Sequence, residues 1–255
     1  MHVPVRASGY AGTAIADTGA EISVMMQSVA TAAHVKMLGA SRNVGSTTSA
    51  VSGQIGLIPE VTIGEATVEN IPVLVLPDAR LTIRSGKETV SLPFILSVYA
   101  LADFGRVAWL DHDKWLALGS AAPASFPDAV PMIWHPTGIA VPLEGPGGRR
   151  AAQFDSGSDV SYLYESGSSL LSDAERSSIV KAKRKIGGVG GVVEQEVRRV
   201  PRADLRLADQ ALVLKNLDIA AQPETGEAAR LGEDVLAAYS AVVFDFDAMT
   251  FSISP

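Results

Sequence analysis

The sequence predicts an all-β protein built from two similar halves. Three observations lead to this fold class: short strands rich in Val, Ile and Leu recur along the chain, glycine-rich turns separate them, and their order repeats once. The chain has 255 residues, of which 47% are hydrophobic, and this suffices for one large or two small cores.

Each half begins with a β-hairpin whose second strand leads into an aspartate. The first hairpin covers residues 3–16 and precedes Asp17; the second covers residues 141–154 and precedes Asp155. The two aspartates are therefore 155 − 17 = 138 residues apart. This offset defines the repeat.

The later elements follow the same plan. A second hairpin is expected at 61–76 and at 203–219, a short helix at 96–104 and at 231–239, and a closing pair of strands at 107–118 and at 242–253. The closing strands begin 242 − 107 = 135 residues apart, within three residues of the first offset. A spacing this regular predicts two copies of one fold.

A proline-rich segment separates the copies. Residues 119–137 contain prolines at 123, 127, 131 and 136, a density that central strands do not tolerate. We therefore expect two lobes, residues 1–120 with Asp17, and residues 121–255 with the linker and Asp155.

One longer helix is expected in the second lobe. Ser172-Asp173-Ala174-Glu175 has the pattern of a capping box, and Gly187-Gly188 would end the helix after Lys185.

The two aspartates stand in matching motifs, Ala14–Ala20 (AIADTGA) and Ala152–Ser158 (AQFDSGS). Each has a short apolar approach, then Asp, a hydroxyl residue, Gly and a small residue. One Asp-(Thr/Ser)-Gly alone is an ordinary turn that arises by chance in roughly one such chain in ten. Two copies at the same point of a repeat resemble the two active-site turns of a bilobal aspartic protease, pepsin-like in plan with a retroviral-type first turn.

The resemblance implies closed-barrel lobes and a catalytic pair, Asp17 and Asp155 (the dyad). Two neighbouring carboxyl groups cannot both ionise readily, so they share a proton; one activates water while the other protonates the carbonyl oxygen. Five residues of the motifs would support the dyad: Thr18, Gly19, Ser156, Gly157 and Ser158. Ser158, whose counterpart is Ala20, is expected to donate to Asp155, which makes Asp155 the ionised member and Asp17 the proton carrier.

Two glycine-rich stretches stand where the family has its substrate-covering flaps. The resemblance assigns substrate contacts to Gly45, Ser46 and Gly53 in the first lobe, and to Gly188 and Gly190 in the second. The glycine run at 187–191 does not have the strand–loop–helix context of a dinucleotide site.

The chain departs from the family at two places. No tyrosine occurs between Tyr10 and Tyr99, so the pepsin-type flap tyrosine is missing, as it is in retroviral proteases. The apolar-apolar-Gly signature before the closing helix reads Arg230-Leu231-Gly232 in the second half, but Ile95-Leu96-Ser97 in the first.

Composition excludes several other classes of protein. The net charge of −7 argues against a nucleic-acid partner, and no apolar run is long enough to span a membrane. The absence of cysteine excludes disulfides, a cysteine nucleophile and thiolate zinc sites. The four histidines, at 2, 34, 112 and 135, lack metal-ligand spacing, so no metal or other cofactor is expected.

The sequence therefore predicts a monomeric aspartic endopeptidase that acts on polypeptides and carries both halves of its site in one chain. The alternatives are a peptide-binding pseudoprotease with weak or no activity, which Ser97 would favour, and a scaffold or inhibitory protein. The compartment stays open: periplasmic or secreted if a leader was removed, otherwise cytoplasmic.

Overall fold

The computed structural model describes residues 1–45, 50–85, 88–189, 191–221 and 226–255. They form two compact units. The N unit contains His2–Phe104 and Lys185–Gln195; the C unit contains Met1, Gly105–Arg184 and Glu196–Pro255. The lobe boundary predicted at residue 120 stays a prediction.

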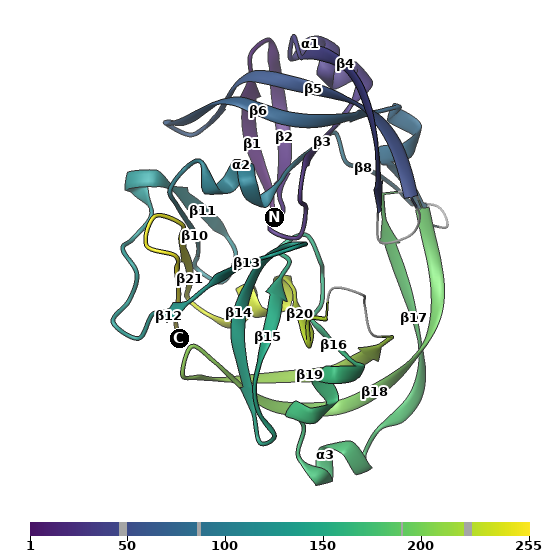
Figure 1. The fold of residues 1–255 in the computed structure, drawn as a ribbon, viewed down its shortest axis with the longest axis vertical. Helices are drawn as coiled ribbons and strands as arrows, with labels where there is room; N and C mark the ends of the chain where they lie inside the picture. Colours follow the sequence, from purple (N-terminus) through teal and green to yellow (C-terminus); the bar gives the residue numbers. More distant parts are fainter. Residues whose placement is uncertain (46–49, 86–87, 190, 222–225) are drawn as a thin grey trace. The chain divides into compact units, whose positions relative to one another are not determined.

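The N unit is organised around one seven-stranded sheet in the order β1-β2-β9-β3-β6-β5-β4 (Figure 1). Its strands are β1 (His2–Ala7), β2 (Tyr10–Ala16), β3 (Ser23–Met26), β4 (Lys36–Gly45), β5 (Ala50–Ile63), β6 (Ala66–Leu76) and β9 (Phe94–Leu96). Strand β1 also pairs with β5, which closes six of the strands into a barrel. Alternation builds the core: in β1, Val3, Val5 and Ala7 are buried while the residues between them are exposed.

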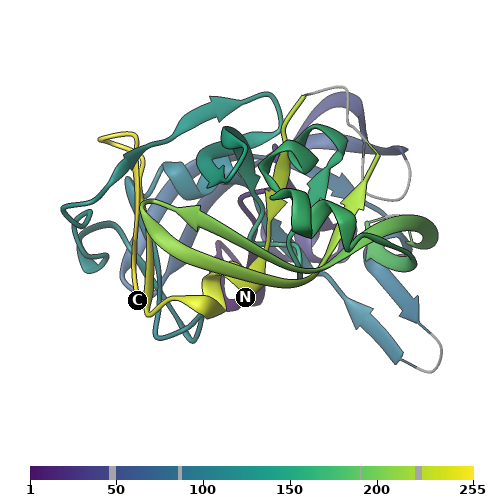
Figure 2. The same cartoon turned by 90° about the horizontal axis from the view of Figure 1, so that it is seen from below.

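The remaining elements of the N unit are short. Strands β7 (Thr82–Ser85) and β8 (Glu88–Ser91) form a separate two-stranded hairpin (Figure 2). The helical segments are α1 (Gln27–Ala32), the 3₁₀ turn η1 (Asp78–Leu81) and α2 (Val98–Ala102).

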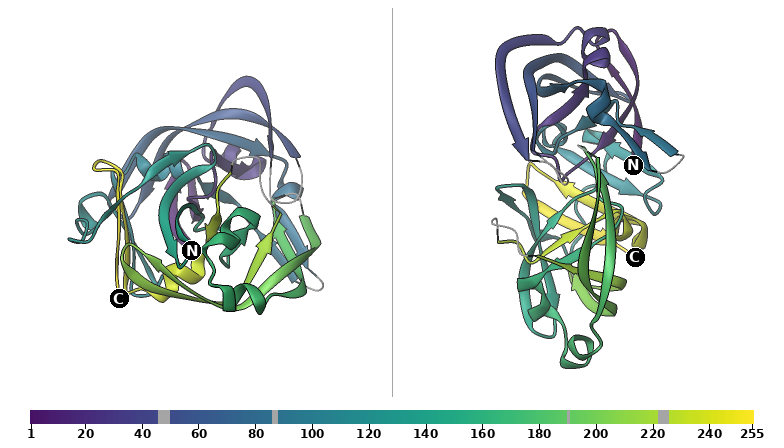
Figure 3. Two further views of the ribbon diagram at one scale, coloured as in Figure 1. Left: turned by 60° about the horizontal axis from the view of Figure 1, so that its bottom comes forward. Right: turned by 90° about the vertical axis from the view of Figure 1, so that its right-hand side faces the viewer.

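The C unit repeats this topology. Its strands are β13 (Ile133–His135), β14 (Gly138–Gly145), β15 (Gly148–Phe154), β16 (Tyr162–Tyr164), β17 (Val180–Gly188), β18 (Gly191–Leu207), β19 (Gln210–Ala220) and β20 (Ala229–Leu231). The end of β17 (185–188) and the start of β18 (191–195) are the parts of these strands that belong to the N unit. The order β14-β15-β20-β16-β19-β18-β17 matches that of the N unit strand for strand, and the pairing of β14 with β18 closes the second barrel. The long strand β18 is best followed in Figure 3. Helical segments are η3 (Glu165–Leu170), α3 (Asp173–Ser177) and α4 (Glu233–Ala238).

A five-stranded sheet, β11-β10-β21-β22-β12, completes the C unit. Its members are β10 (Arg106–Leu110), β11 (Trp115–Leu118), β12 (Val130–Pro131), β21 (Ala241–Asp245) and β22 (Thr250–Ser254), and η2 (Gly119–Ala121) follows β11. The closing strands of the two sequence halves thus meet in one sheet, with β10 antiparallel to β21. The predicted fold class, all-β with closed barrels and a few short helices, is confirmed.

Aromatic packing in the C unit anchors the strand that leads into Asp155. Phe154 is fully buried and packs edge-on against Phe244, with ring centroids 5.0 Å apart. Phe251 lies 5.7 Å from Phe154, and Trp109 lies 5.5 Å from Phe244. Such pairs add to the free energy of burial, so the end of β15 is held firmly.

The helix predicted at 172–185 is wrong beyond its first turn. The capping box of Ser172 and Glu175 is present, but α3 ends at Ser177 and the basic segment belongs to strand β17. Ala182, Arg184 and Ile186 are half-buried while Lys181, Lys183 and Lys185 are exposed. This two-residue period is that of a strand, and the sequence pattern already contained it.

Candidate active site

The turn after β2 positions Asp17. The backbone N–H of Asp17 donates to Leu96 O (2.9 Å), and the N–H of Gly19 donates to Asp17 Oδ1 (2.8 Å). Ala20 N then donates to Asp17 O (3.3 Å), and Val98 N donates to Ala20 O (3.0 Å). The carboxylate is half-buried and Thr18 beside it is fully buried, so the turn fixes Asp17 at the end of its strand.

The turn after β15 repeats each of these bonds. Asp155 N donates to Leu231 O (2.8 Å), Gly157 N donates to Asp155 Oδ1 (3.1 Å), and Ser158 N donates to Asp155 O (3.0 Å). Glu233 N closes the set by donating to Ser158 O (2.7 Å). Asp155 and Ser156 are both buried, at 8% and 1% exposure.

The structure thus brings Asp17, Thr18 and Gly19 together in the N unit, and does the same with the second motif in the C unit. Four corresponding hydrogen bonds hold the aspartate turn in each unit, so the two turns are copies of one structural motif. The N–H of each aspartate donates to a strand that runs parallel to the strand preceding the aspartate. The motif therefore depends on tertiary pairing and not on local sequence alone.

The side-chain hydrogen bonds that support each turn differ between the two units. In the N unit Ser97 caps α2, since its Oγ accepts from Ala100 N (3.3 Å), and it also accepts from Ser23 Oγ (3.2 Å). The serine that replaces the family's glycine therefore has a structural role.

In the C unit the corresponding positions are Gly232 and Ser161. Gly232 N donates to Ser161 Oγ (2.9 Å), and Ser161 Oγ donates to Asp234 Oδ1 (2.6 Å). The N–H of Ser161 also donates to Asp234. A Cβ on Gly232 would lie 2.6 Å from Ser158 O, which explains the glycine.

The expected hydrogen bond from Ser158 to Asp155 is wrong. The Ser158 hydroxyl donates to Val160 O (3.0 Å), and a hydroxyl has one proton to give. The side chain that does reach Asp155 is Arg230, whose Nη1 donates to Asp155 Oδ2 (3.1 Å). Sequence reasoning missed Arg230; the signal was a charged residue at the first position of a signature that is otherwise apolar.

The predicted flap residues are only partly described. Gly45 and Gly53 lie in the β4–β5 hairpin, paired with Ala50 and Arg42. Gly53 is buried, and a Cβ there would lie 2.7 Å from Leu76 Cδ2, so a larger residue would require the neighbouring leucine side chains to shift. Gly188 is the last residue of β17. Ser46 and Gly190 lie outside the described residues.

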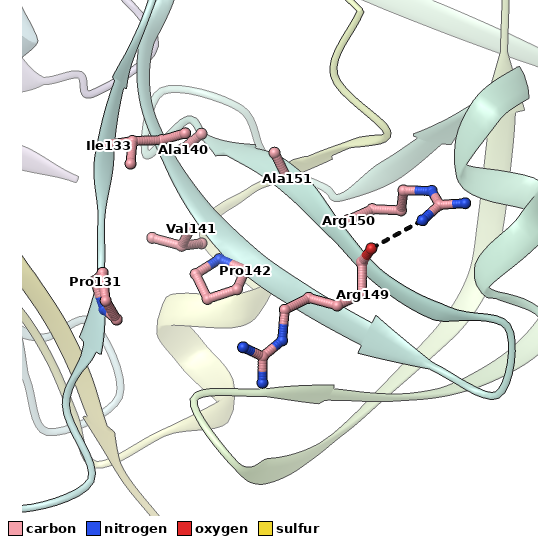
Figure 4. Close-up of a pocket in the computed structure, with 8 residues that line it drawn as sticks. All are labelled: Pro131, Ile133, Ala140, Val141, Pro142, Arg149, Arg150 and Ala151. Atoms are coloured by element: carbon pink, nitrogen blue, oxygen red, sulfur yellow. Dashed lines mark hydrogen bonds between the residues drawn. The ribbon is translucent and has the colours of Figure 1, made fainter.

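The structure shows a pocket of about 350 Å³ on the β14–β15 hairpin (Figure 4). It is mainly apolar and is lined by Pro131, Ile133, Ala140, Val141, Pro142, Arg149, Arg150 and Ala151. None of the predicted site residues lines it, so it does not belong to the candidate active site.

Two further features bear on the class of site. Across the described ranges, no group of three or more His, Asp or Glu side chains is placed to hold a metal ion. In those ranges there is also no helix with the length and hydrophobicity needed to cross a membrane.

Comparison with known proteins agrees with this geometry. Residues 3–92, which include the Asp17 turn, match the family model described as aspartyl protease. Among solved structures, the aspartic proteinase from Irpex lacteus matches with a TM-score of 0.62 at 11% identity. That match covers 99% of this chain and 92% of the other. The chain has the fold of an aspartyl protease. No curated protein matches.

The aspartyl-protease fold accounts for the two barrels and for their parallel β2–β9 and β15–β20 pairs. At 11% identity the structural match speaks for the fold alone.

Proposed function

We propose that the chain is an aspartic endopeptidase that hydrolyses peptide bonds with Asp17 and Asp155 as its dyad. The observation that carries this proposal is the repeated turn, in which each aspartate has its backbone N–H, Oδ1 and carbonyl bonded in the same way. One shared proton would let one carboxylate take a proton from water while the other protonates the substrate carbonyl.

The supporting residues have roles consistent with this proposal. The N–H groups of Gly19 and Gly157 fix the carboxylates, and the buried hydroxyl residues Thr18 and Ser156 would stiffen the turns. The β4–β5 hairpin would cover an extended polypeptide substrate. Both aspartates belong to one chain, so we propose a monomeric enzyme.

The residue that would favour a peptide-binding pseudoprotease is Ser97. That reason is weakened, because Ser97 caps α2 and the Asp17 turn keeps all four hydrogen bonds.

The test is digestion of an unfolded protein between pH 3 and 7 by the wild type, Asp17→Asn and Asp155→Asn. Each substitution should lower the rate by at least about a hundred-fold, because a dyad without one carboxyl loses its shared proton. Matched controls are Glu21→Gln and Asp159→Asn, exposed acidic residues close to the two motifs, which should retain activity.

Circular dichroism should be unchanged in all four variants. Cleavage at the wild-type rate by Asp17→Asn or Asp155→Asn would contradict the assignment of these two residues as the dyad. Peptide binding without cleavage by the wild type would identify a pseudoprotease instead.

A further inference from the structure

Five neighbouring strands of each barrel contain a row of paired residues that starts two positions before the candidate catalytic aspartate. Residues paired across a sheet share a face, as do residues two apart in one strand. In the N unit every member of the row is apolar: Ile15, Ile95, Val24, Leu74 and Ile55. In the C unit every member carries a polar group: Gln153, Arg230, Tyr162, Asp218 and Arg199. The two units therefore offer different chemistry at the same register.

The polar row extends from Asp155 into the sheet. Arg230 Nη1 donates to Asp155 Oδ2 (3.1 Å), and Arg230 Nη2 donates to Gln153 Oε1 (2.7 Å). Tyr162 is half-buried and follows Arg230 in the row. Strands in a sheet lie about 4.8 Å apart, so the strand of Tyr162 lies about 10 Å from the strand that leads to Asp155. An extended peptide covers this distance in about three residues.

Most of the charge in the row has a partner. Arg199 donates to both carboxylate oxygens of buried Asp218, from Nε to Oδ1 (2.6 Å) and from Nη2 to Oδ2 (3.1 Å). Arg230 contacts Asp155, and its Nη2 also lies 4.0 Å from Glu227 Oε1. These two arginines are therefore already engaged with carboxylates.

A third arginine, Arg184 of β17, stands over the row without such a partner. Its guanidinium carbon lies 4.2 Å from the centre of the Tyr162 ring, and that of Arg230 lies 5.9 Å from the same ring. In the part of the chain that the structure describes, no carboxylate forms an ion pair with Arg184, and its Nη1 is buried without a hydrogen-bond acceptor. Arginine keeps its proton in proteins, so this charge is permanent.

The ligand that this arrangement favours is a carboxylate. A guanidinium pairs with a carboxylate through parallel N–H donors, and the Tyr162 ring restricts the orientation of Arg184 before a ligand arrives. A cationic side chain would be repelled by Arg184 and Arg230, and an apolar one would leave the unpaired charge as it is.

We infer that Arg184, supported by Tyr162, is a specificity-determining residue that selects polypeptide substrates with Glu or Asp within about three residues of the scissile bond. This rests on the proposed function and names the substrate class of the same site. Because the corresponding row of the N unit is apolar, one acidic position is expected and not two.

Digestion of a peptide library by the wild type locates the acidic position. Two peptides that differ only by Glu or Gln at this position then measure the effect of the charge. The wild type should cleave the Glu peptide with a kcat/KM at least about tenfold higher, which is the size expected of one charged hydrogen bond.

Variants of Arg184 test the assignment. Arg184→Gln should lower the Glu-to-Gln ratio to about one, and Arg184→Glu should make a Lys peptide the better substrate. The matched control is Lys181→Gln, which removes an exposed cation from the same strand and should keep the full ratio. Arg184→Lys keeps the charge but not the parallel donors, so its ratio should lie between those of the wild type and Arg184→Gln.

Loss of folding in Arg184→Gln, read by circular dichroism, is covered by Arg184→Met. Methionine retains an apolar contact with the Tyr162 ring and should also give a ratio of about one. A wild type that cleaves without a preference for acidic residues would overturn the inference. So would a ratio that stays at the wild-type value in the folded Arg184 variants without the positive charge.

Equilibrium binding separates this inference from the proposed function. Fluorescence anisotropy with peptides that carry a reduced, non-hydrolysable bond should give a Kd at least about tenfold lower for Glu than for Gln, and Arg184→Gln should abolish the difference. This preference in a wild type that cleaves nothing would refute the proposed function alone. Cleavage with equal Kd values for the two peptides would refute the inference alone.

Discussion

The turns that carry Asp17 and Asp155 have the same backbone hydrogen bonds but different support. Behind Asp17, Ser97 is at once the residue after the parallel strand and the N-cap of α2. Behind Asp155, Gly232 takes both positions without a capping side chain, and Asp234 accepts hydrogen bonds from the N–H and the hydroxyl of Ser161.

The difference shows that the fold requires the hydrogen-bond pattern and not a particular residue. A side chain is accepted at 97 because it caps the helix. At 232 it is excluded, because the carbonyls of Ser158 and Val160 approach within 2.6 and 2.9 Å of where a Cβ would lie. Substitutions exchanged between the units should therefore have unequal effects.

The largest effect is expected from Gly232→Ser, which gives the C unit the serine of the N unit. The new Cβ would meet backbone atoms of the Asp155 turn, and overpacking of this kind costs about 3 kcal/mol of unfolding free energy. The reciprocal Ser97→Gly loses a cap and one buried hydrogen bond, which should cost about 1 kcal/mol. Urea unfolding measures both.

Equal destabilisation by these two variants would contradict the comparison. Gly232→Ala, which adds the Cβ without the hydroxyl, should be as damaging as Gly232→Ser, because the steric contact causes the loss.

A smaller effect is expected from Asp234→Ala. It removes the acceptor of the Ser161 N–H and hydroxyl, and leaving buried donors without a partner costs about 2 kcal/mol. The matched variant in the N unit is Tyr99→Ala, at the equivalent position and 49% exposed, which should change stability by less than about 0.5 kcal/mol. Thermal or urea unfolding would show whether the C unit depends on this carboxylate; equal losses would mean that it does not.

The parts of the fold that depend on repetition could be predicted from the sequence. Two motifs 138 residues apart, hairpins before each and a capping box at Ser172 all have local signals, and the structure contains them. Strand β17 also has a local signal, the alternation of Ala182, Arg184 and Ile186 with lysines, but the capping box before it and its basic residues are equally typical of a helix.

The contacts of the candidate site could not be predicted in the same way. Ser158 and Arg230 are 72 residues apart (230 − 158), and which of them reaches Asp155 depends on the pairing of β15 with β20. A hydroxyl next to a carboxylate in sequence suggests a bond, yet the turn directs it to Val160 O. Long-range pairing decides such contacts, and no local pattern encodes it.

The smallest effect concerns Glu233, the first residue of α4, and its acidic neighbour Asp113. The first residue of α2 in the N unit is the apolar Val98. Burial and a hydrogen bond with Glu233 raise the pKa of Asp113 to about 7, so the folded protein binds a proton there more tightly than the unfolded chain, where the pKa is 3.8. This contribution to stability is complete below pH 4 and is lost as the pH rises to 7.

Asp113→Asn cannot ionise and keeps a donor for Glu233, and asparagine tolerates the positive φ of 66° found at this position. The unfolding free energy of Asp113→Asn, measured relative to that of the wild type, should therefore increase between pH 4 and pH 7.5. The gain should stay under about 1 kcal/mol, because solvent screens a group that is only partly buried. Asp111→Asn is the matched control: it removes an exposed carboxylate from the same turn, next to Lys114. Urea unfolding at both pH values decides the matter, since a difference between Asp113→Asn and the wild type that stays constant with pH would show that Asp113 does not titrate against Glu233.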